Sequence, residues 1–221
     1  MICDNILVVG GSGDLGRAIV DNLQHKGDAL VFSTFNKSPF NYKNCTELKY
    51  CYPGNNEGFF HTFNDIPINK LIHCIGVRSS KQSIKETDIE EWKQLFDINV
   101  LSLVDIYKNL LPSLRQGKAK ILAVSSTAST DCKANSGPYS VSKAGLDALI
   151  KTIAEEEKEH GITASIIAPP LFNSKLAREL AVLKGYKDLE EYKLKALNGN
   201  LIEADSVALK IIDELTRCRN D

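Results

Sequence analysis

The stretch Asn5–Gly16, which reads NILVVGGSGDLG, decides the fold of this chain. Its apolar run ends at Val9 and predicts a short buried strand of a parallel sheet. Helical spacing follows over Arg17–His25, and a second strand is predicted at Ala29–Phe35. A strand, a glycine turn, a helix and a strand make one βαβ unit, the building block of a dinucleotide-binding sheet.

Three glycines of this turn have separate mechanical roles in such a unit. Gly10 permits the tight turn, Gly13 lets the backbone approach a pyrophosphate, and Gly16 lets the helix pack closely on the strand. The first N–H groups of the helix then face the phosphates. Any sharp strand-to-helix turn can use glycine, but this position after the first strand favours nucleotide binding.

The end of the second strand predicts which cofactor is bound. A carboxylate there would bind the ribose 2′-hydroxyl of NAD, but Ser33–Lys37 contains no acid. Thr34 and Asn36 can donate hydrogen bonds and Lys37 supplies positive charge, which suits a 2′-phosphate. We therefore predict NADP rather than NAD, with a merely solvated turn as the alternative.

The rest of the chain continues to alternate strands and helices. Further strands are predicted at Glu47–Tyr52, Lys70–Ile75, Lys120–Val124 and Ile162–Ala168. Helices are predicted at Asn56–Asn64, Asp88–Leu114 (broken or kinked by Pro112), 136–159, Ser174–Leu183, Leu189–Ala196 and Ala204–Thr216. This alternation predicts a single α/β domain over residues 1–221, a doubly wound parallel sheet with a Rossmann fold. Its ligand is expected over the carboxyl ends of the strands.

Composition excludes several classes of function. The chain has 221 residues and a net charge of −1, so nothing in its charge points to nucleic acid or to a membrane surface. Its apolar runs are too short to cross a bilayer, and no signal segment is recognised at Met1, so we expect a cytoplasmic protein. The six cysteines lack metal-ligand spacing, so we predict reduced thiols and no metal site.

A second stretch, Tyr139–Lys143, points to chemistry. Ser136 can cap the helix that begins here, and Pro138 suits its first turn. Tyr139 and Lys143 are one helical turn apart and share a face. The ammonium group and the positive end of the helix favour the phenolate, so that Tyr139 can pass a proton near neutral pH. The motif alone arises by chance in many chains and gains meaning from its surroundings.

Those surroundings carry a family resemblance. Ser126 follows a predicted strand thirteen positions before Tyr139, and Asn99 lies inside the helix that precedes that strand. With the glycine turn and Lys143, this set resembles the short-chain dehydrogenase/reductase family over nearly the whole chain.

The resemblance implies a role for each residue. Tyr139 would be the catalytic acid/base, Ser126 would hydrogen-bond the substrate oxygen, and Lys143 would hold the nicotinamide ribose. Asn99 would hold a water molecule in the proton relay, and Ser174 would touch the nicotinamide amide. Together with the 2′-phosphate contacts argued above, the expected cofactor site comprises Gly10, Ser12, Gly13, Asp14, Leu15, Gly16, Thr34, Asn36, Lys37, Gly76, Tyr139, Lys143, Pro169 and Ser174.

The chain also departs from the family pattern. Asp14 stands where many members have the middle glycine and would place negative charge near the phosphates. The segment His73–Gly76 replaces the family's Asn-Asn-Ala-Gly, so the asparagine that braces the sheet is missing. No strand is predicted after Leu215, so we expect six strands without the family's final one. We therefore expect a homodimer built on the helices of Asn99 and Tyr139.

The resulting hypothesis is an NADP-dependent oxidoreductase that moves hydride between nicotinamide and a small carbonyl compound or secondary alcohol. The alternatives are a dinucleotide-binding regulatory protein on the same fold, and a nicotinamide-assisted epimerase or dehydratase. The short region 171–200 is expected to contact the substrate. Lys175 or Arg178 could meet an acidic substrate there, although a solvated helix face explains them equally well.

Overall fold

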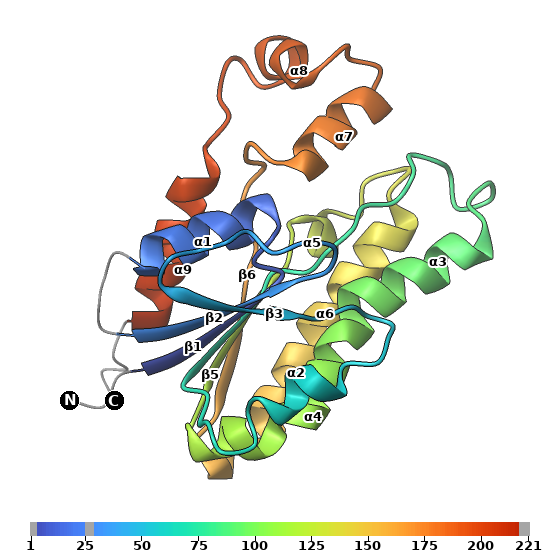
Figure 1. Ribbon diagram of the computed structural model, residues 1–221. Coiled ribbons are helices and arrows are strands. Elements are labelled where there is room, and N and C mark those ends of the chain that lie inside the picture. Colours follow the sequence, from blue (N-terminus) through green and yellow to red (C-terminus); the bar gives the residue numbers. More distant parts are fainter. Residues whose placement is uncertain (1–3, 25–28, 217–221) are drawn as a thin grey trace.

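Six parallel strands form the central sheet of the computed structural model, which describes residues 4–24 and 29–216 (Figure 1). The strands lie in the order β3-β2-β1-β4-β5-β6. They span β1 (Asp4–Val9), β2 (Ala29–Phe35), β3 (Cys45–Lys49), β4 (Lys70–His73), β5 (Lys120–Val124) and β6 (Thr163–Ile167). The chain runs from β1 outward to β3 and then crosses back to β4, so the strand order reverses beside β1, where such folds bind ligands. This is the doubly wound Rossmann fold that the sequence predicts.

Helices cover both faces of the sheet. On one face α1 (Asp14–Gln24) packs beside α9 (Ala204–Thr216). The other face carries α2 (Glu57–His61), α3 (Ile89–Phe96), α4 (Ser102–Gln116) and α6 (Gly137–Glu156). Successive strand residues point to opposite faces, so Leu7 joins the core under α4 and α6 while its neighbour Val8 joins the core under α1 and α9.

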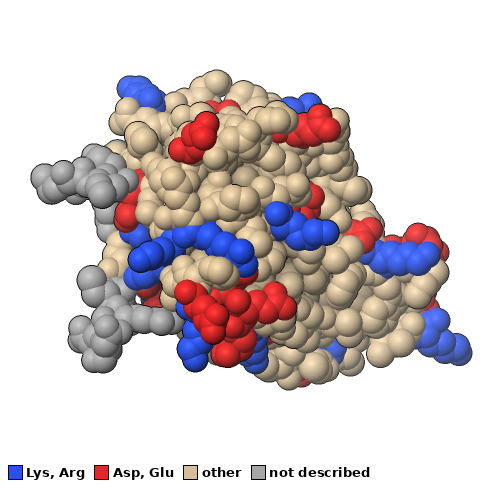
Figure 2. All heavy atoms as spheres, turned by 90° about the horizontal axis from the view of Figure 1, so that it is seen from below, with Lys and Arg blue, Asp and Glu red and all other residues tan. Residues whose placement is uncertain are grey.

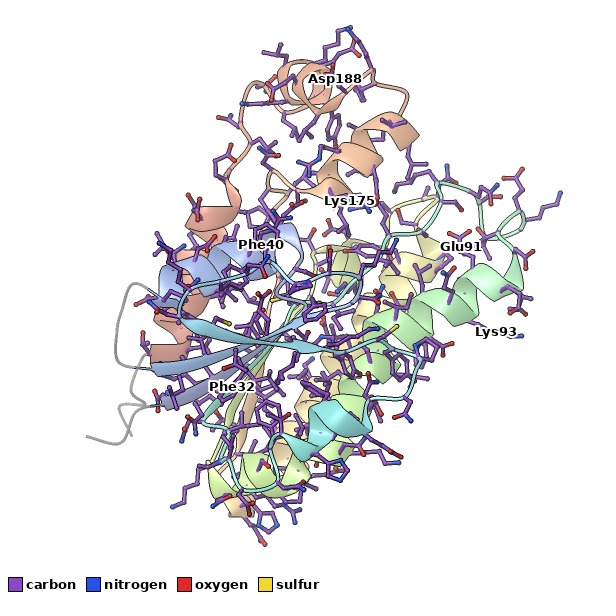
Figure 3. The ribbon with its side chains drawn as sticks, viewed as in Figure 1. Phe32, Phe40, Glu91, Lys93, Lys175 and Asp188 are labelled. Carbon is purple, nitrogen blue, oxygen red and sulfur yellow. The ribbon has the colours of Figure 1, made fainter. Side chains whose placement is uncertain are left out.

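Two short helices stand over one edge of the sheet. In Figure 1, α7 (Lys175–Leu183) and α8 (Leu189–Ala196) lie beyond the layers of the sandwich. Figure 3 places Lys175 at the sheet side of α7 and Asp188 farther away, beside α8. The two helices share a small core of their own, formed by Ala177, Leu180, Ala181, Leu189 and Tyr192. A bridge between Phe172 and Ile202 holds the two ends of this segment together.

The long helix around Asn99 differs from the prediction at one point. It continues through Pro112 to Gln116, and its irregularity lies instead in the π-helical turn η1 (Asp97–Leu101). Pro112 removes one helical hydrogen bond, which would have gone to the carbonyl of Lys108. Both residues are exposed, so water can satisfy that carbonyl and the helix is not broken.

Smaller boundary differences have local causes. The strand predicted at Glu47–Tyr52 lies at Cys45–Lys49, because the ring of Tyr50 turns into the core. The Tyr139 helix stops at Glu156, and a 3₁₀ turn follows it. Ser136 stands at the N-cap position, but its side chain makes no capping hydrogen bond, and its hydroxyl contacts the ammonium group of Lys81 instead. The predicted helix end at His25 lies outside the described residues.

The surface carries charges of both signs. Figure 2, which views the molecule from below, shows lysine and arginine side chains beside aspartate and glutamate side chains on that face. No helix within residues 4–24 and 29–216 is both long and apolar enough to span a bilayer. The thiols of Cys45, Cys51, Cys74 and Cys132 are free, while Cys3 and Cys218 lie outside the described ranges.

Candidate active site

The glycine turn begins the site at the carboxyl end of β1. Gly10 makes the turn with φ of 89°, and its carbonyl accepts a hydrogen bond of 3.0 Å from the N–H of Gly13. A Cβ atom on Gly16 would lie 2.2 Å from the Gly10 carbonyl oxygen, so no larger residue fits there. The helix α1 therefore packs directly on the turn, and its first N–H groups remain available to an anion.

The end of β2 supports the glycine turn through a hydrogen bond. The hydroxyl of Thr34 accepts a hydrogen bond of 2.8 Å from the N–H of Gly10, and Thr34 is 2 % exposed. Asn36 and Lys37 follow in the exposed bend after β2. The three residues predicted to contact a 2′-phosphate therefore differ in exposure. Thr34 is buried and supports the turn, whereas Asn36 and Lys37 are open to solvent.

Asp14 does not project freely toward the cofactor path. Its carboxylate accepts a hydrogen bond from the N–H of Lys175 and one of 3.2 Å from the guanidinium of Arg178. Arg178 also donates to the side-chain oxygen of Asn173 at 3.2 Å. The two cations considered for an acidic substrate are therefore tied to the glycine turn: Lys175 through its backbone and Arg178 through its side chain.

The tyrosine and lysine lie at the start of α6, as predicted, and both are buried. The ammonium of Lys143 donates a hydrogen bond of 2.9 Å to the carbonyl of Val124, the last residue of β5. Burial lowers the pKa of Lys143, and the neighbouring Tyr139 and Asp147 oppose that change. Ser126 follows β5 by two residues, and its hydroxyl accepts a hydrogen bond of 3.2 Å from the N–H of Ala128.

Asn99 is placed by the π-helical turn η1. Its amide group bonds both the N–H of Val77, at 2.8 Å, and the carbonyl of Val77, at 3.0 Å, and it donates to the hydroxyl of Ser142 at 2.9 Å. π-helical turns are frequent at functional sites. Asn99 and Lys143 both approach Gly76, where a Cβ atom would lie 3.6 Å from the Asn99 Oδ1 and 3.3 Å from the Lys143 Nζ.

One groove of about 680 Å³ brings most of the predicted residues together. Its lining includes Ser12, Gly13, Asp14, Leu15, Gly16, Gly76, Ser126, Tyr139, Lys143, Pro169 and Ser174. Of the other predicted residues, Gly10, Thr34 and Asn99 support this groove from behind, as their contacts above describe. Asn36 and Lys37 lie outside its lining. A groove of this size suits a small-molecule ligand, and its glycine-lined end fits a dinucleotide.

A histidine provides a brace for the sheet where the expected asparagine is missing. The hydroxyl of Ser102 donates 2.6 Å to the carbonyl of Ile98, so it accepts the 3.0 Å hydrogen bond from Nε2 of His73. This contact ties the end of β4 to α4. Burial lowers the pKa of His73 to about 3, so its ring is neutral. We therefore interpret His73 as a structural residue.

Several site residues were missed by sequence reasoning. A Cβ atom on Gly11 would lie 1.8 Å from the Ser33 hydroxyl oxygen, so Gly11 also lies in a closely packed part of the turn. Arg17, Arg78, Lys81 and Lys184 also line the groove. Arg78 and Lys81 follow Gly76 by two and five positions. Their place just after the glycine that follows β4 was the signal in the sequence.

The protein has a Rossmann fold, and one groove contains a serine, a tyrosine, a lysine and a glycine turn. This combination defines a nicotinamide-dependent oxidoreductase. The chain matches the family described as short chain dehydrogenase over residues 60–182 and belongs to this family. It is an enzyme that uses NAD or NADP and acts on a small molecule.

The relatives agree with this assignment. The chain is 28% identical over 212 residues to the uncharacterized oxidoreductase YIR035C of Saccharomyces cerevisiae, covering 88% of this chain and 80% of that protein. It is 23% identical over 223 residues to the 3-oxoacyl-[acyl-carrier-protein] reductase FabG of Salmonella typhimurium, covering 94% of this chain and 89% of that protein.

A solved structure supports the fold. A short chain dehydrogenase family protein from Francisella tularensis superposes with a TM-score of 0.83 at 22% identity. The match covers 97% of this chain and 92% of that chain.

Proposed function

We propose that the protein is an NADPH-dependent reductase of small carbonyl compounds, which can also oxidise the corresponding secondary alcohols. The observation that carries the proposal is the single groove lined by Ser126, Tyr139, Lys143 and the glycine turn. When bound, the nicotinamide supplies or accepts the hydride. The side chains of the groove must then bind the substrate oxygen and move its proton.

Tyr139 donates that proton during reduction and accepts it during oxidation. The Ser126 hydroxyl donates a hydrogen bond to the substrate oxygen, where negative charge develops as the carbonyl is reduced. The ammonium of Lys143, which lies by Gly76, holds the ribose of the cofactor beside Tyr139. We propose that Asn99 also binds a relay water, since its Oδ1 has two lone pairs and accepts one hydrogen bond, from the N–H of Val77, among the described residues.

NADP is the proposed cofactor because positive charge and no acid follow β2. Lys37 and Asn36 are exposed there and free to meet a 2′-phosphate. Arg17 is the residue after Gly16 and lines the groove. Its guanidinium carbon is 4.0 Å from the centre of the Phe40 ring. Its buried Nε has no hydrogen-bond partner among the described residues, which supports a role toward a phosphate.

We propose that residues 171–200 form the substrate region of a single domain. Leu171, Phe172, Leu176, Leu180, Tyr192 and Leu197 from this region line the groove. Apolar walls of this kind, combined with a small number of polar groups that fix orientation, are usual for small-molecule ligands.

We further propose a cytoplasmic homodimer that pairs through the helices of Asn99 and Tyr139. Phe96 and Val141 support this arrangement, because these large apolar side chains are 41% and 51% exposed on the helical layer that contains α3 and α6. Apolar side chains gathered on an exposed face favour association. A molar mass twice that of the chain in light scattering would support it.

A screen of carbonyl compounds with NADPH, monitored by nicotinamide absorbance, tests the function. Net consumption of NADPH supports reduction. A rearranged product without consumption would support an epimerase or dehydratase instead. Cofactor binding without any turnover over a broad screen would support the regulatory alternative.

A further inference from the structure

We infer that the substrate is an anionic carbonyl compound, whose carboxylate or phosphate is bound by Arg78 and Lys81 beside Tyr139. The inference rests on the proposed reductase function and specifies the class of its substrate. It depends on where unpaired positive charge lies in the groove.

The guanidinium of Arg78 lies over the ring of Tyr139. Its guanidinium carbon lies 4.9 Å from the centre of the Tyr139 ring, and its buried Nε has no hydrogen-bond partner among the described residues. A guanidinium presents a planar fork of N–H groups that suits a carboxylate or a phosphate. An anion bound here would lie next to the residue that handles the substrate oxygen.

Lys81 brings a second cation to the same place. Its ammonium contacts the hydroxyl of Ser136, three residues before Tyr139. Burial and the positive charges of Arg78, Lys184 and Lys133 lower the pKa of Lys81. Cations that repel one another in a groove are stabilised together when an anion binds between them.

The acids that line the groove do not neutralise this group. Asp14 is paired with Arg178, and Asp131 lies 3.2 Å from the ammonium of Lys133. Arg78, Lys81 and Lys184 form no ion pair with any carboxylate of the described residues. Lys184 instead donates 2.9 Å to the hydroxyl of Tyr192. The groove therefore has positive charge left over for a ligand.

The cofactor phosphates do not account for this charge. They belong to the glycine turn, whose backbone N–H groups receive them after β1. Arg78 and Lys81 follow β4 and lie against Tyr139 and Ser136, at the end of the groove where the carbonyl is reduced.

Matched pairs of substrates test the inference. Reduction of acetoacetate is compared with that of ethyl acetoacetate, and dihydroxyacetone phosphate with dihydroxyacetone, at saturating NADPH. We expect the anionic member of one pair to be preferred about tenfold or more in kcat/KM. The pair that shows the preference identifies the anion as carboxylate or phosphate.

Variants connect the preference to these side chains. Arg78→Met and Lys81→Met should each lower the anionic-over-neutral ratio about tenfold, and Arg78→Lys should retain part of it. Lys85→Met removes an exposed cation of the same loop that does not line the groove, and should leave the ratio unchanged. The dissociation constant of NADPH is measured for each variant.

Several outcomes overturn the inference and leave the reductase function standing. They are equal rates for both members of each pair, an unchanged ratio in Arg78→Met and Lys81→Met, or weaker NADPH binding as the main effect of those variants. If no probe is reduced, calorimetry with the NADP-loaded protein decides. Binding of acetoacetate or dihydroxyacetone phosphate that is lost in both variants supports the inference, and no binding overturns it. Failure of the reductase function itself shows separately, as no turnover in a broad carbonyl screen.

Discussion

The carboxylate of Asp14 accepts a hydrogen bond of 3.2 Å from the guanidinium of Arg178, 164 positions further along the chain. It also accepts one from the N–H of Lys175, so the glycine turn and the start of α7 are joined by a single side chain. This acid stands where the family resemblance implies a glycine. Its contacts across the groove give a structural reason for the departure.

Replacing Asp14 should loosen α7. In Asp14→Ala we expect faster amide hydrogen exchange over Lys175–Leu183, with a global loss of stability of less than about 1 kcal/mol, because the ion pair is partly exposed. NADPH should bind more tightly, since a negative charge near the proposed pyrophosphate path is removed. Asp21→Ala, at an exposed position of the same helix, serves as the control. Unchanged exchange in α7 would contradict the anchoring role.

Removing the proposed proton donor should stop the reaction without preventing NADPH binding. Tyr139→Phe keeps the ring, so we expect NADPH to bind within about twofold of its original affinity while kcat falls about 100-fold or more. Steady-state assays measure kcat, and calorimetry measures the affinity for NADPH. Tyr52→Phe, outside the groove, should behave as the unmodified protein. A Tyr139→Phe variant with full turnover would rule out the assignment.

Reversing the charge after β2 should change the cofactor preference. In Lys37→Glu we expect the dissociation constant of NADPH to rise about tenfold and that of NADH to change little, because only the former carries a 2′-phosphate. Lys108→Glu makes the same change in net charge at an exposed site on α4. If the unmodified protein binds NADH more tightly than NADPH, the proposed preference is wrong.

The buried histidine makes stability depend on pH. The pKa of His73 is about 3 in the folded protein, below its ordinary value of 6.5. The unfolded chain therefore binds more protons between these two values, and the free energy of unfolding falls as the pH is lowered through that range. The slope from this one group is at most about 1.4 kcal/mol per pH unit.

Urea titrations from pH 7 to pH 4 measure this dependence. His73→Asn should flatten the slope, whatever its own effect on stability at pH 7. His61→Asn, which removes an exposed histidine, should not. Equal slopes in all three proteins would show that His73 is not neutral in the fold.

The close packing around the glycine turn predicts a rescue experiment. Gly16→Ala places a Cβ atom against backbone, and Gly11→Ala places one 1.8 Å from the Ser33 hydroxyl. Each should cost about 1–3 kcal/mol. Adding Ser33→Ala should recover part of the loss in Gly11→Ala but none in Gly16→Ala. Gly58→Ala in helix α2, where a Cβ meets nothing within 4 Å, should be neutral or slightly stabilising.

Much of the fold was predictable because the signals were local. The strand at Ala29–Phe35 and the helices at Leu189–Ala196 and Ala204–Thr216 have the predicted bounds. Their apolar periodicity depends on neighbours within a few turns. The π-helical turn was not predictable, since its geometry depends on contacts that Asn99 makes with Val77 and Ser142.

The candidate site also has parts that the sequence predicted and parts that it did not. Tyr139 with Lys143, and the glycine turn, were recognisable because their spacing is short, and one groove contains both. The buried role of Thr34 and the partners of Asp14 were not recognisable, because each depends on a residue more than twenty positions away.

The sequence by itself thus determined the alternation of strands and helices, the family, and the residue types able to bind a dinucleotide and move a proton. Those properties follow from local spacing and from the chemistry of single side chains. Only the tertiary structure decided which cations are neutralised: it pairs Arg178 with Asp14, and it leaves Arg78 over the Tyr139 ring without an ion pair among the described residues. Electrostatic partners are set by distance in space, which the folding of the sheet imposes on residues far apart in the chain.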